Sequence, residues 1–148
     1  MRLVVQRVSE ASCTVDGVVT GAINTGFMVL VGFCNDDTEE IVVKMANKLK
    51  KLRVFDDADG KMNLSLKDVD GSILSISQFT LYADCAKGNR PSFCGAMKGE
   101  EATKMYDYFN SLLEDEYQVE KGIFGADMKI KLLNDGPVTI IMDSKEML

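Results

Sequence analysis

Residues 27–33, with the sequence FMVLVGF, form an uninterrupted apolar run. Side chains alternate between the two faces of a strand, so a strand of this composition needs cover on both faces. The run is far too short to span a bilayer. It therefore predicts a central strand in a sheet that has other layers packed on both sides.

Strand patterns also occur before and after this run. Residues 2–8 are predicted to form a strand, and Cys13–Thr20 a hairpin. We expect Asp16 and Gly17 to form its turn, because both residue types tolerate the positive φ angles of a type I′ turn. Three later strands are predicted at residues 72–82, at residues 127–132, where Met128, Ile130 and Leu132 alternate with charged residues, and at residues 138–142.

Two segments have helical periodicity. Asp37 and Glu40 have the spacing of a capping box, and a helix from about 38 to 53 follows. A second helix is expected over Gly99–Glu116. One stripe of this second helix is apolar and is expected to belong to the core rather than to bind a cofactor: Ala102, Met105, Tyr106, Phe109, Leu112 and Leu113.

The predicted order is β-β-β-α-β-β-α-β-β, in one domain spanning residues 1–148. A chain of 148 residues that is 46% hydrophobic can bury a single core. No repeat or linker divides it. The fold class is α/β, of an α+β-like kind, with two helices packed outside a largely antiparallel sheet.

The acidic segment Phe55–Gly60 resembles a calcium-binding loop only superficially. Aligning Gly60 with the glycine of an EF-hand places Phe55 at the first ligand position and Leu66 where the bidentate glutamate belongs. We therefore predict a polar turn here and no metal site.

Histidine is absent from the chain. This excludes a Ser-His-Asp triad, a Cys-His pair and a metal site built from histidines. The four cysteines match neither a zinc site nor a dense disulfide framework, so we expect reduced thiols, with Cys85 and Cys94 chemically inert. A strand pattern begins at Arg2 without a secretion signal, which predicts a cytoplasmic protein that does not enter a membrane.

The net charge of −6 argues against a surface that coats nucleic acid. An RNA partner must therefore be bound locally. Two groups of basic residues are candidates, namely Lys87, Arg90 and Lys98, and the series Lys44, Lys48, Lys50, Lys51 and Arg53, which is more simply explained as a solvated helix face.

Four segments of the sequence are distinctive when taken together: RLVVQRV at residues 2–8, SQFT at 77–80, KGNRPSF at 87–93 and NDGPVT at 134–139. In combination they closely resemble the D-aminoacyl-tRNA deacylases, over nearly the whole chain. The resemblance implies a three-layer sandwich, with helices over two sheet layers that close towards a barrel.

The first of these motifs comprises Ser77, Gln78, Phe79 and Thr80, which we predict to be catalytic. Their side chains alternate along a strand, so they cannot all line one pocket. If the strand ends here, the N–H groups of Phe79 and Thr80 become free to bind an oxyanion. The alternative is an ordinary buried strand whose polar groups bond to their neighbours. Thr80 lacks a base and is assigned a binding role, and the resemblance implies that the 2′-hydroxyl of the substrate assists hydrolysis.

The second motif contains Gly136 and Pro137. The resemblance implies a cis peptide that reaches across a homodimer into the partner's pocket and rejects L-amino acids. It also implies that Arg7 braces this turn across the dimer; an ordinary strand-end arginine is the alternative. For Phe124 and Met128, a place in the adenosine pocket and a place in the core both stay open.

The expected function is hydrolysis of the ester of D-aminoacyl-tRNA, and of glycyl-tRNA, without a metal or cofactor. The expected partners are the 3′ aminoacyl end of tRNA and a second copy of the chain. One alternative is a non-catalytic dimer that binds an RNA 3′ end or a small metabolite. A threonine amidohydrolase is disfavoured because Thr80 is internal and has no activating amine.

Overall fold

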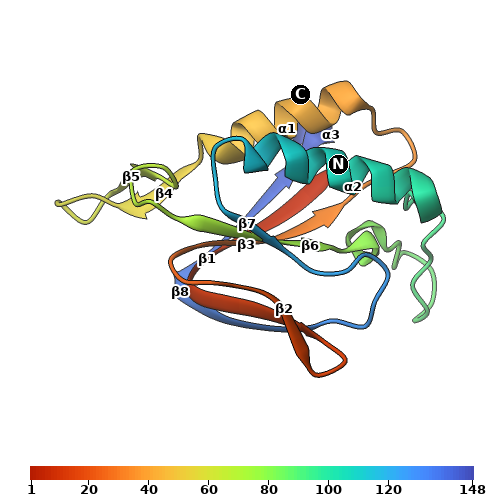
Figure 1. Cartoon of the computed structure of the whole chain (residues 1–148). Helices are drawn as coiled ribbons and strands as arrows, with labels where there is room; N and C mark the ends of the chain where they lie inside the picture. The colour runs from red at the N-terminus through yellow and green to blue at the C-terminus, as the bar shows by residue number, and fades with distance from the viewer.

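The computed structural model describes residues 1–148 and contains one strongly curved sheet with two long helices over one face (Figure 1). The helices are α1, Glu39–Lys50, and α2, Gly99–Glu114, which pack against each other. The sheet contains β1 Arg2–Val15, β2 Val18–Ile23, β3 Gly26–Gly32, β6 Ser72–Ser77, β7 Val119–Lys121 and β8 Lys129–Asp143. The smaller elements are the hairpin β4 Arg53–Asp56 and β5 Met62–Ser65, the 3₁₀ turn η1 Phe79–Tyr82, and α3 Ser144–Met147.

Strand β3 lies at the centre, as its composition predicts. The strand order is β2-β1-β3-β6-β7, with β8 also paired to β1. The pairs of β1 with β2, β3 and β8 are antiparallel, whereas β6 pairs in parallel with β3 and β7. Phe27, Val29 and Val31 of β3 join the core under the helices, and Met28 joins a second core on the opposite face.

The sheet curls until its two ends almost meet. Thr20 of β2 donates a hydrogen bond of 3.0 Å to the carbonyl of Lys121 in β7. Gly21 permits this approach, because a Cβ there would lie 2.9 Å from the Cβ of Glu120. The curled sheet encloses the second core, which consists of Val8, Ala11, Cys13, Ile23, Met28, Leu74 and Ile76. The predicted fold class, with two sheet layers beneath the helices, is confirmed.

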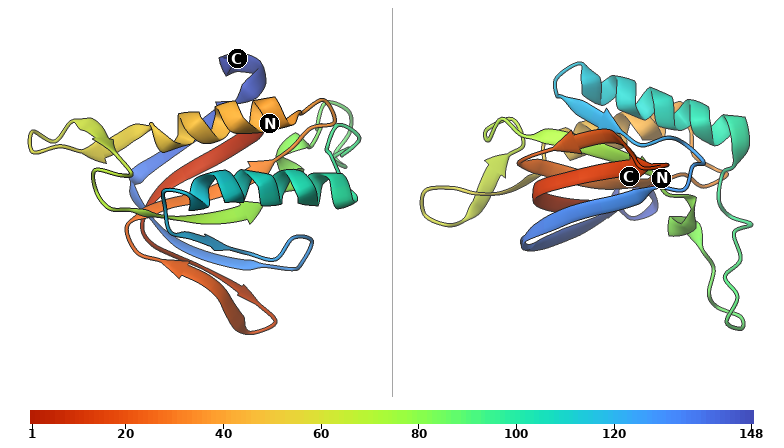
Figure 2. Two further views of the ribbon diagram at one scale, coloured as in Figure 1. Left: turned by 45° about the horizontal axis from the view of Figure 1, so that its top comes forward. Right: turned by 60° about the horizontal axis from the view of Figure 1, so that its bottom comes forward.

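The two longest strands run side by side and bring the chain ends together (Figure 2). The amide of Ser144 donates to the carbonyl of Met1 over 2.9 Å. The sequence predicted a strand over residues 2–8 and two separate strands near the C-terminus. This was wrong: β1 continues through a register shift into the hairpin, and β8 is continuous from Lys129 to Asp143. Pairing of these two strands on both sides of an irregularity overrides the local breaks in pattern.

The predicted element order was also incomplete. Between the helices lie three strands rather than two, and β7 and α3 were not predicted. The short hairpin β4–β5 projects from the body of the protein (Figure 1). Its two strands are joined by the polar turn predicted near Gly60, where Asp57 accepts hydrogen bonds from the amides of Asp59 and Lys61. The turn at Asp16-Gly17 has the expected positive φ angles of 50° and 77°.

Helix α1 begins differently from the prediction. Thr38 is its N-cap and accepts a hydrogen bond from the amide of Ile41 over 3.4 Å. Asp37 is instead buried, where it pairs with the amino group of Met1 and accepts from the amide of Cys34. The helix ends at Lys50, before the expected residue 53, and α2 ends at Glu114 rather than Glu116. The apolar stripe of α2 packs in the core as predicted.

All four cysteines are free; Cys13 and Cys34 are buried, and Cys85 and Cys94 are exposed. No helix of the structure has the length and apolar character needed to cross a membrane.

Candidate active site

The SQFT segment lies where strand β6 ends. The prediction of a strand over residues 72–82 was wrong, because β6 ends at Ser77. The amide of Gln78 makes the last bond to the sheet, to the carbonyl of Val31 over 2.7 Å. The chain then turns, and the amides of Leu81 and Ala83 donate to the carbonyls of Gln78 and Thr80 over 3.3 and 3.1 Å.

This turn leaves two main-chain donors at its leading edge. Leu81 supplies the first N–H that closes the turn, so the N–H groups of Phe79 and Thr80 precede it. The leading N–H groups of a helical turn have no carbonyl partner within it. They are therefore available to a ligand, as an oxyanion site requires.

Gly32 allows the turn to lie directly on the sheet. A Cβ at Gly32 would come within 2.9 Å of the carbonyl oxygen of Gln78 and 3.1 Å of the Cβ of Leu81. Real Cβ atoms do not approach backbone oxygen this closely. Close packing of η1 on β3 thus depends on a residue without a side chain at position 32.

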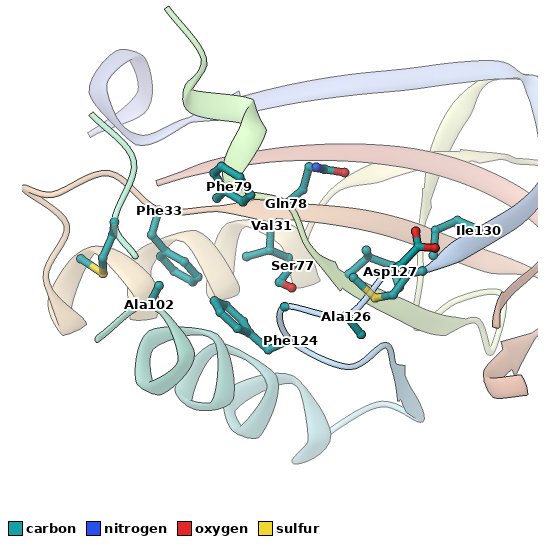
Figure 3. A pocket seen from close by; sticks show the side chains of 14 residues that line it. Val31, Phe33, Ser77, Gln78, Phe79, Ala102, Phe124, Ala126, Asp127 and Ile130 are labelled. Atoms are coloured by element: carbon teal, nitrogen blue, oxygen red, sulfur yellow. The ribbon is translucent and has the colours of Figure 1, made fainter. Parts of the chain in front are cut away.

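A hollow of about 240 Å³ opens beside this turn (Figure 3). Most of its wall is apolar, and the predicted residues Ser77, Gln78, Phe79, Phe124 and Met128 all lie in it. The other lining residues are Val31, Phe33, Ile76, Met97, Ala102, Gly125, Ala126, Asp127 and Ile130. The structure thus brings together five of the nine predicted site residues.

Phe124 is fixed by a buried tyrosine. Its ring lies 6.0 Å from the ring of Tyr106, centroid to centroid. The hydroxyl of Tyr106 donates to the carbonyl of Ser75 over 2.7 Å, and burial raises the pKa of Tyr106. The neutral side chain of Tyr106 therefore holds Phe124 in the wall of the hollow. Phe124 also packs against the core under the helices, and Met128 against the second core, so both residues line the hollow and contribute to a core.

Thr80 lies outside the hollow and is exposed. Its hydroxyl accepts a hydrogen bond from the side-chain amide of Gln78 over 2.5 Å. An amide N–H cannot take a proton from the hydroxyl, so this contact does not activate a nucleophile. Phe79 is half-exposed and meets the ring of Phe93 edge to face, with centroids 5.1 Å apart.

Gly136 and Pro137 lie in an irregularity within β8 rather than in a turn between two strands. Gln6 pairs with Thr139 and Val8 with Asn134, so residues 135–138 bulge out opposite a single residue of β1. The peptide bond between Gly136 and Pro137 is cis, and Gly136 has φ +130°. The side chain of Asn134 closes the bulge by accepting from the amide of Val138 over 3.0 Å.

Arg7 is the residue opposite the bulge. It is buried in the middle of β1, which rules out the alternative of an ordinary strand-end arginine. Its guanidinium donates to the carbonyls of Asp135 and Val54 over 3.0 and 2.7 Å. The resemblance implied a brace across a dimer, whereas this contact braces the turn of the same chain.

The bulge and the hollow lie apart in one chain. Neither Gly136, Pro137 nor Arg7 lines the hollow. Ser77 is next to Val31 and Val31 next to Leu3, so the motif meets β1 four residues before Arg7. Ser77 and Arg7 are therefore separated by four residues along β1, which correspond to about 13 Å, and by two spacings between neighbouring strands.

Sequence reasoning missed several residues of the hollow. Asp127 supplies a carboxylate at the exposed rim, where it binds Lys129 over 3.0 Å. Phe33, Ala102 and Ala126 also line the wall. Their types are common in cores, and only the folding of distant segments onto one another identifies them. Lys87, Arg90 and Lys98 are exposed and take part in none of the ion pairs. No cluster of three metal-ligating side chains occurs.

Comparisons with known proteins define the class of protein as a hydrolase with this barrel-like fold. The profile of the family described as D-Tyr-tRNA(Tyr) deacylase matches residues 4–143. The chain belongs to this family, whose members hydrolyse the ester bond of D-aminoacyl-tRNA.

Two solved structures are similar over nearly their whole length. One is a c-Myc DNA unwinding element binding protein, with 42% sequence identity and a TM-score of 0.91; the match covers 97% of this chain and 98% of the other. The second is a probable eukaryotic D-amino acid tRNA deacylase, with 18% identity and a TM-score of 0.81, and coverage of 95% and 97%. At that identity the second comparison supports the fold alone.

Proposed function

We propose that this D-aminoacyl-tRNA deacylase selects its substrates by chirality, and that a second copy of the chain completes each active site. One observation carries the proposal. Ser77, Gln78 and Phe79 share a hollow with Phe124 and Met128, whereas Gly136 and Pro137 lie outside the hollow of their own chain. In our proposal these are two parts of one site, and they do not meet within a single chain.

The ester carbonyl binds at the leading edge of η1. The N–H groups of Phe79 and Thr80 donate to its oxygen and stabilise the negative charge that develops when the ester is attacked. Loss of one such donor typically costs on the order of a hundredfold or more in rate. Ser77 and Gln78 fix the position of these amides, and the 2′-hydroxyl of the substrate's ribose assists attack because it is already held beside the ester.

The terminal adenosine occupies the apolar part of the hollow. Phe124 offers an aromatic face and Met128 a polarisable thioether, both of which suit a base. Base stacking on an aromatic ring is sequence-tolerant, and every tRNA ends in the same nucleoside. This binding mode therefore accepts many tRNAs.

The partner's Gly136-Pro137 turn excludes L-amino acids. Its rigid carbonyls collide with the side chain of an L-amino acid but not with that of a D-amino acid. The enzyme therefore selects D-aminoacyl esters mainly by excluding L-aminoacyl esters. Arg7 supports the turn within its own chain. Because no contact depends on the identity of the side chain, the enzyme accepts a range of D-aminoacyl esters and also glycyl-tRNA.

A second candidate is binding to a nucleic acid end without catalysis. The name of the relative with 42% identity, which refers to a DNA unwinding element, favours considering it. The net charge of −6 disfavours a surface that coats duplex DNA. A binder of this kind would hold D-aminoacyl-tRNA without turnover.

The test is deacylation of D-tyrosyl-tRNA and L-tyrosyl-tRNA by the same preparation, with glycyl-tRNA as a third substrate. We expect rapid release of D-tyrosine and of glycine, and release of L-tyrosine at the rate without enzyme. Equal rates for the D- and L-esters would contradict chiral selection, and binding without release of either amino acid would favour the second candidate.

A further inference from the structure

Arg2 lies next to the catalytic turn at the start of β1. In the antiparallel register, Arg2 is opposite Gly32 of β3. Gly32 is also the residue on which η1 packs, within 2.9 Å of where a Cβ would lie. Arg2 is thus the nearest charged residue of β1 to η1 across the strand pair.

The guanidinium of Arg2 contacts two residues of this turn. Its Nη1 donates to the carbonyl of Leu81 over 2.6 Å. Its Cζ lies 4.8 Å from the centroid of the Tyr82 ring, a distance typical of a cation–π contact. Leu81 and Tyr82 follow Phe79 and Thr80 directly, so these contacts fix the turn that presents the two amides.

Asp143 holds the other side of the guanidinium. Nε and Nη2 of Arg2 each lie 2.8 Å from the same carboxylate oxygen of this residue. Asp143 is buried, and its second oxygen accepts from the amide of Lys145 over 2.9 Å. Arg2 therefore has little freedom to move, because its anchor is itself fixed at the end of β8.

The protonation states support a permanent contact. Burial alone raises the pKa of Asp143, but hydrogen bonds from the Lys145 amide and from Arg2 outweigh burial and lower it. Burial raises the pKa of Tyr82, so its ring stays neutral beside the cation. At neutral pH the arrangement consists of a carboxylate, a guanidinium and an uncharged aromatic face.

We propose that Arg2 is a positioning residue for deacylation, which ties η1 to the end of β8 and holds the amides of Phe79 and Thr80 in their catalytic places. The proposal rests on the proposed function. Arginine suits the role because its planar fork donates in several directions at once, whereas a lysine ammonium is a single point of charge.

The first test compares steady-state deacylation of D-tyrosyl-tRNA by the wild type, Arg2→Ala and Arg2→Lys. A misplaced amide donor lowers the rate of the chemical step. We therefore expect kcat to fall about tenfold or more in Arg2→Ala, with KM little changed. Arg2→Lys keeps the charge and the aliphatic stem and should fall by less. The control is Lys61→Ala, since Lys61 is exposed, forms no ion pair and lies on the projecting β4–β5 hairpin.

The second test needs no activity. Amide hydrogen exchange is measured at Leu81 and Ala83, whose N–H groups close the turn. We expect faster exchange at both in Arg2→Ala and Arg2→Lys and unchanged exchange in Lys61→Ala. If the wild type fails to deacylate, the proposed function falls and exchange still decides the role of Arg2.

Two results would overturn the inference. One is unchanged exchange at Leu81 and Ala83 in the Arg2 variants. The other is a folded Arg2→Ala enzyme with kcat within about twofold of the wild type, since a misplaced catalytic group should cost more. If Arg2→Ala does not fold, Arg2→Lys decides by the same two measurements.

Discussion

Two turns of this protein are each held by an arginine of strand β1, yet in different ways. Arg2 holds the turn η1 and is itself paired with a buried carboxylate at 2.8 Å. Arg7 holds the Gly136-Pro137 bulge through the carbonyl of Asp135 and is anchored to the carbonyl of Val54 in β4. Its contacts to the exposed carboxylates of Asp56 and Asp135 are long, at 3.4 and 3.7 Å.

This difference separates the two regions energetically. Exposed ion pairs contribute little, so the bulge depends on hydrogen bonds from a buried guanidinium to main-chain oxygen. The turn η1 is contacted by an arginine whose carboxylate partner, Asp143, can titrate. If the two proposals hold, Arg7 acts mainly on stability, whereas Arg2 also places the amides of η1.

The substitution Gly32→Ala should have the largest effect on turnover. The new methyl group would lie 2.9 Å from the carbonyl oxygen of Gln78, which is backbone and cannot rotate away, so η1 must shift. We expect kcat to fall on the order of a hundredfold, because displacement of catalytic groups by about 1 Å has that cost. Gly95→Ala is the matched control, since a Cβ there meets nothing within 4 Å. Equal kcat for the two variants would show that close packing on β3 is not required.

Removal of the substrate's 2′-hydroxyl should slow deacylation by about as much as Gly32→Ala does. A D-tyrosyl ester of tRNA ending in 2′-deoxyadenosine should react on the order of a hundredfold more slowly, because the neighbouring group is lost. Thr80→Ala should retain activity within a few-fold, since the exposed Thr80 hydroxyl has no base and the main-chain amides remain. Both rates are measured under single-turnover conditions. A covalent ester trapped on Thr80 would instead make threonine the nucleophile.

The substitution Arg7→Met should mainly destabilise the protein. It keeps a long apolar side chain but leaves the carbonyls of Val54 and Asp135 without their donor. We expect the free energy of unfolding to fall by about 2–4 kcal/mol, as for buried polar groups left unpaired. Urea unfolding at constant m-value measures this, with Arg53→Ala expected within about 0.5 kcal/mol of the wild type. A stable Arg7→Met protein would show that the bulge does not depend on the guanidinium.

Acid should affect the turn held by Arg2 before the bulge held by Arg7. The pKa of Asp143 is lowered from its ordinary value of 3.8 in the folded state, so the stability that it contributes is present above pH 3.8 and is lost as pH falls through the lower folded value. The charged groups beside it are Arg2 and the amino group of Met1. Asp143→Asn should therefore be less stable than the wild type at pH 7, and the two should converge at low pH. Thermal melts from pH 7 to pH 2 measure this. A difference in stability between the two proteins that stays constant over this range would contradict the prediction.

Chelation should have the smallest effect. The chain has no histidine, and its carboxylates match no ligand spacing for zinc or calcium. EDTA should leave the rate of D-tyrosyl-tRNA hydrolysis unchanged. Loss of turnover that one specific divalent ion restores would refute this expectation.

Local chemistry determined which features could be predicted from the sequence. The central strand followed from the composition of residues 27–33, and the hairpin from Asp16-Gly17. The end of β6 did not, because the apolar pattern continues to Leu81 while the chain is already turning. The choice of Thr38 over Asp37 as N-cap depends on a partner 36 residues away in the chain, the amino group of Met1.

The sequence supplied a set of candidate site residues but not their arrangement. The motifs singled out Phe79 and Pro137 without indicating that one chain keeps them apart. That separation follows from strand order and register, which bring Ser77 next to Val31 and place the bulge opposite Arg7. The contacts of Arg2 could not be found from sequence either, since its partners come from residues 81, 82 and 143.

A mixing experiment tests most directly whether the two turns complete one site across two copies. Chains with Gly32→Ala, defective in η1, are unfolded and refolded together with chains carrying Gly136→Ala, where a side chain would be strained at φ +130°. In a symmetric dimer with random pairing, about a quarter of the sites then combine an intact η1 with an intact turn. We predict that the mixture regains about that share of wild-type D-tyrosyl-tRNA hydrolysis, well above either variant alone. A mixture no more active than the mean of the two separate variants would contradict a shared site.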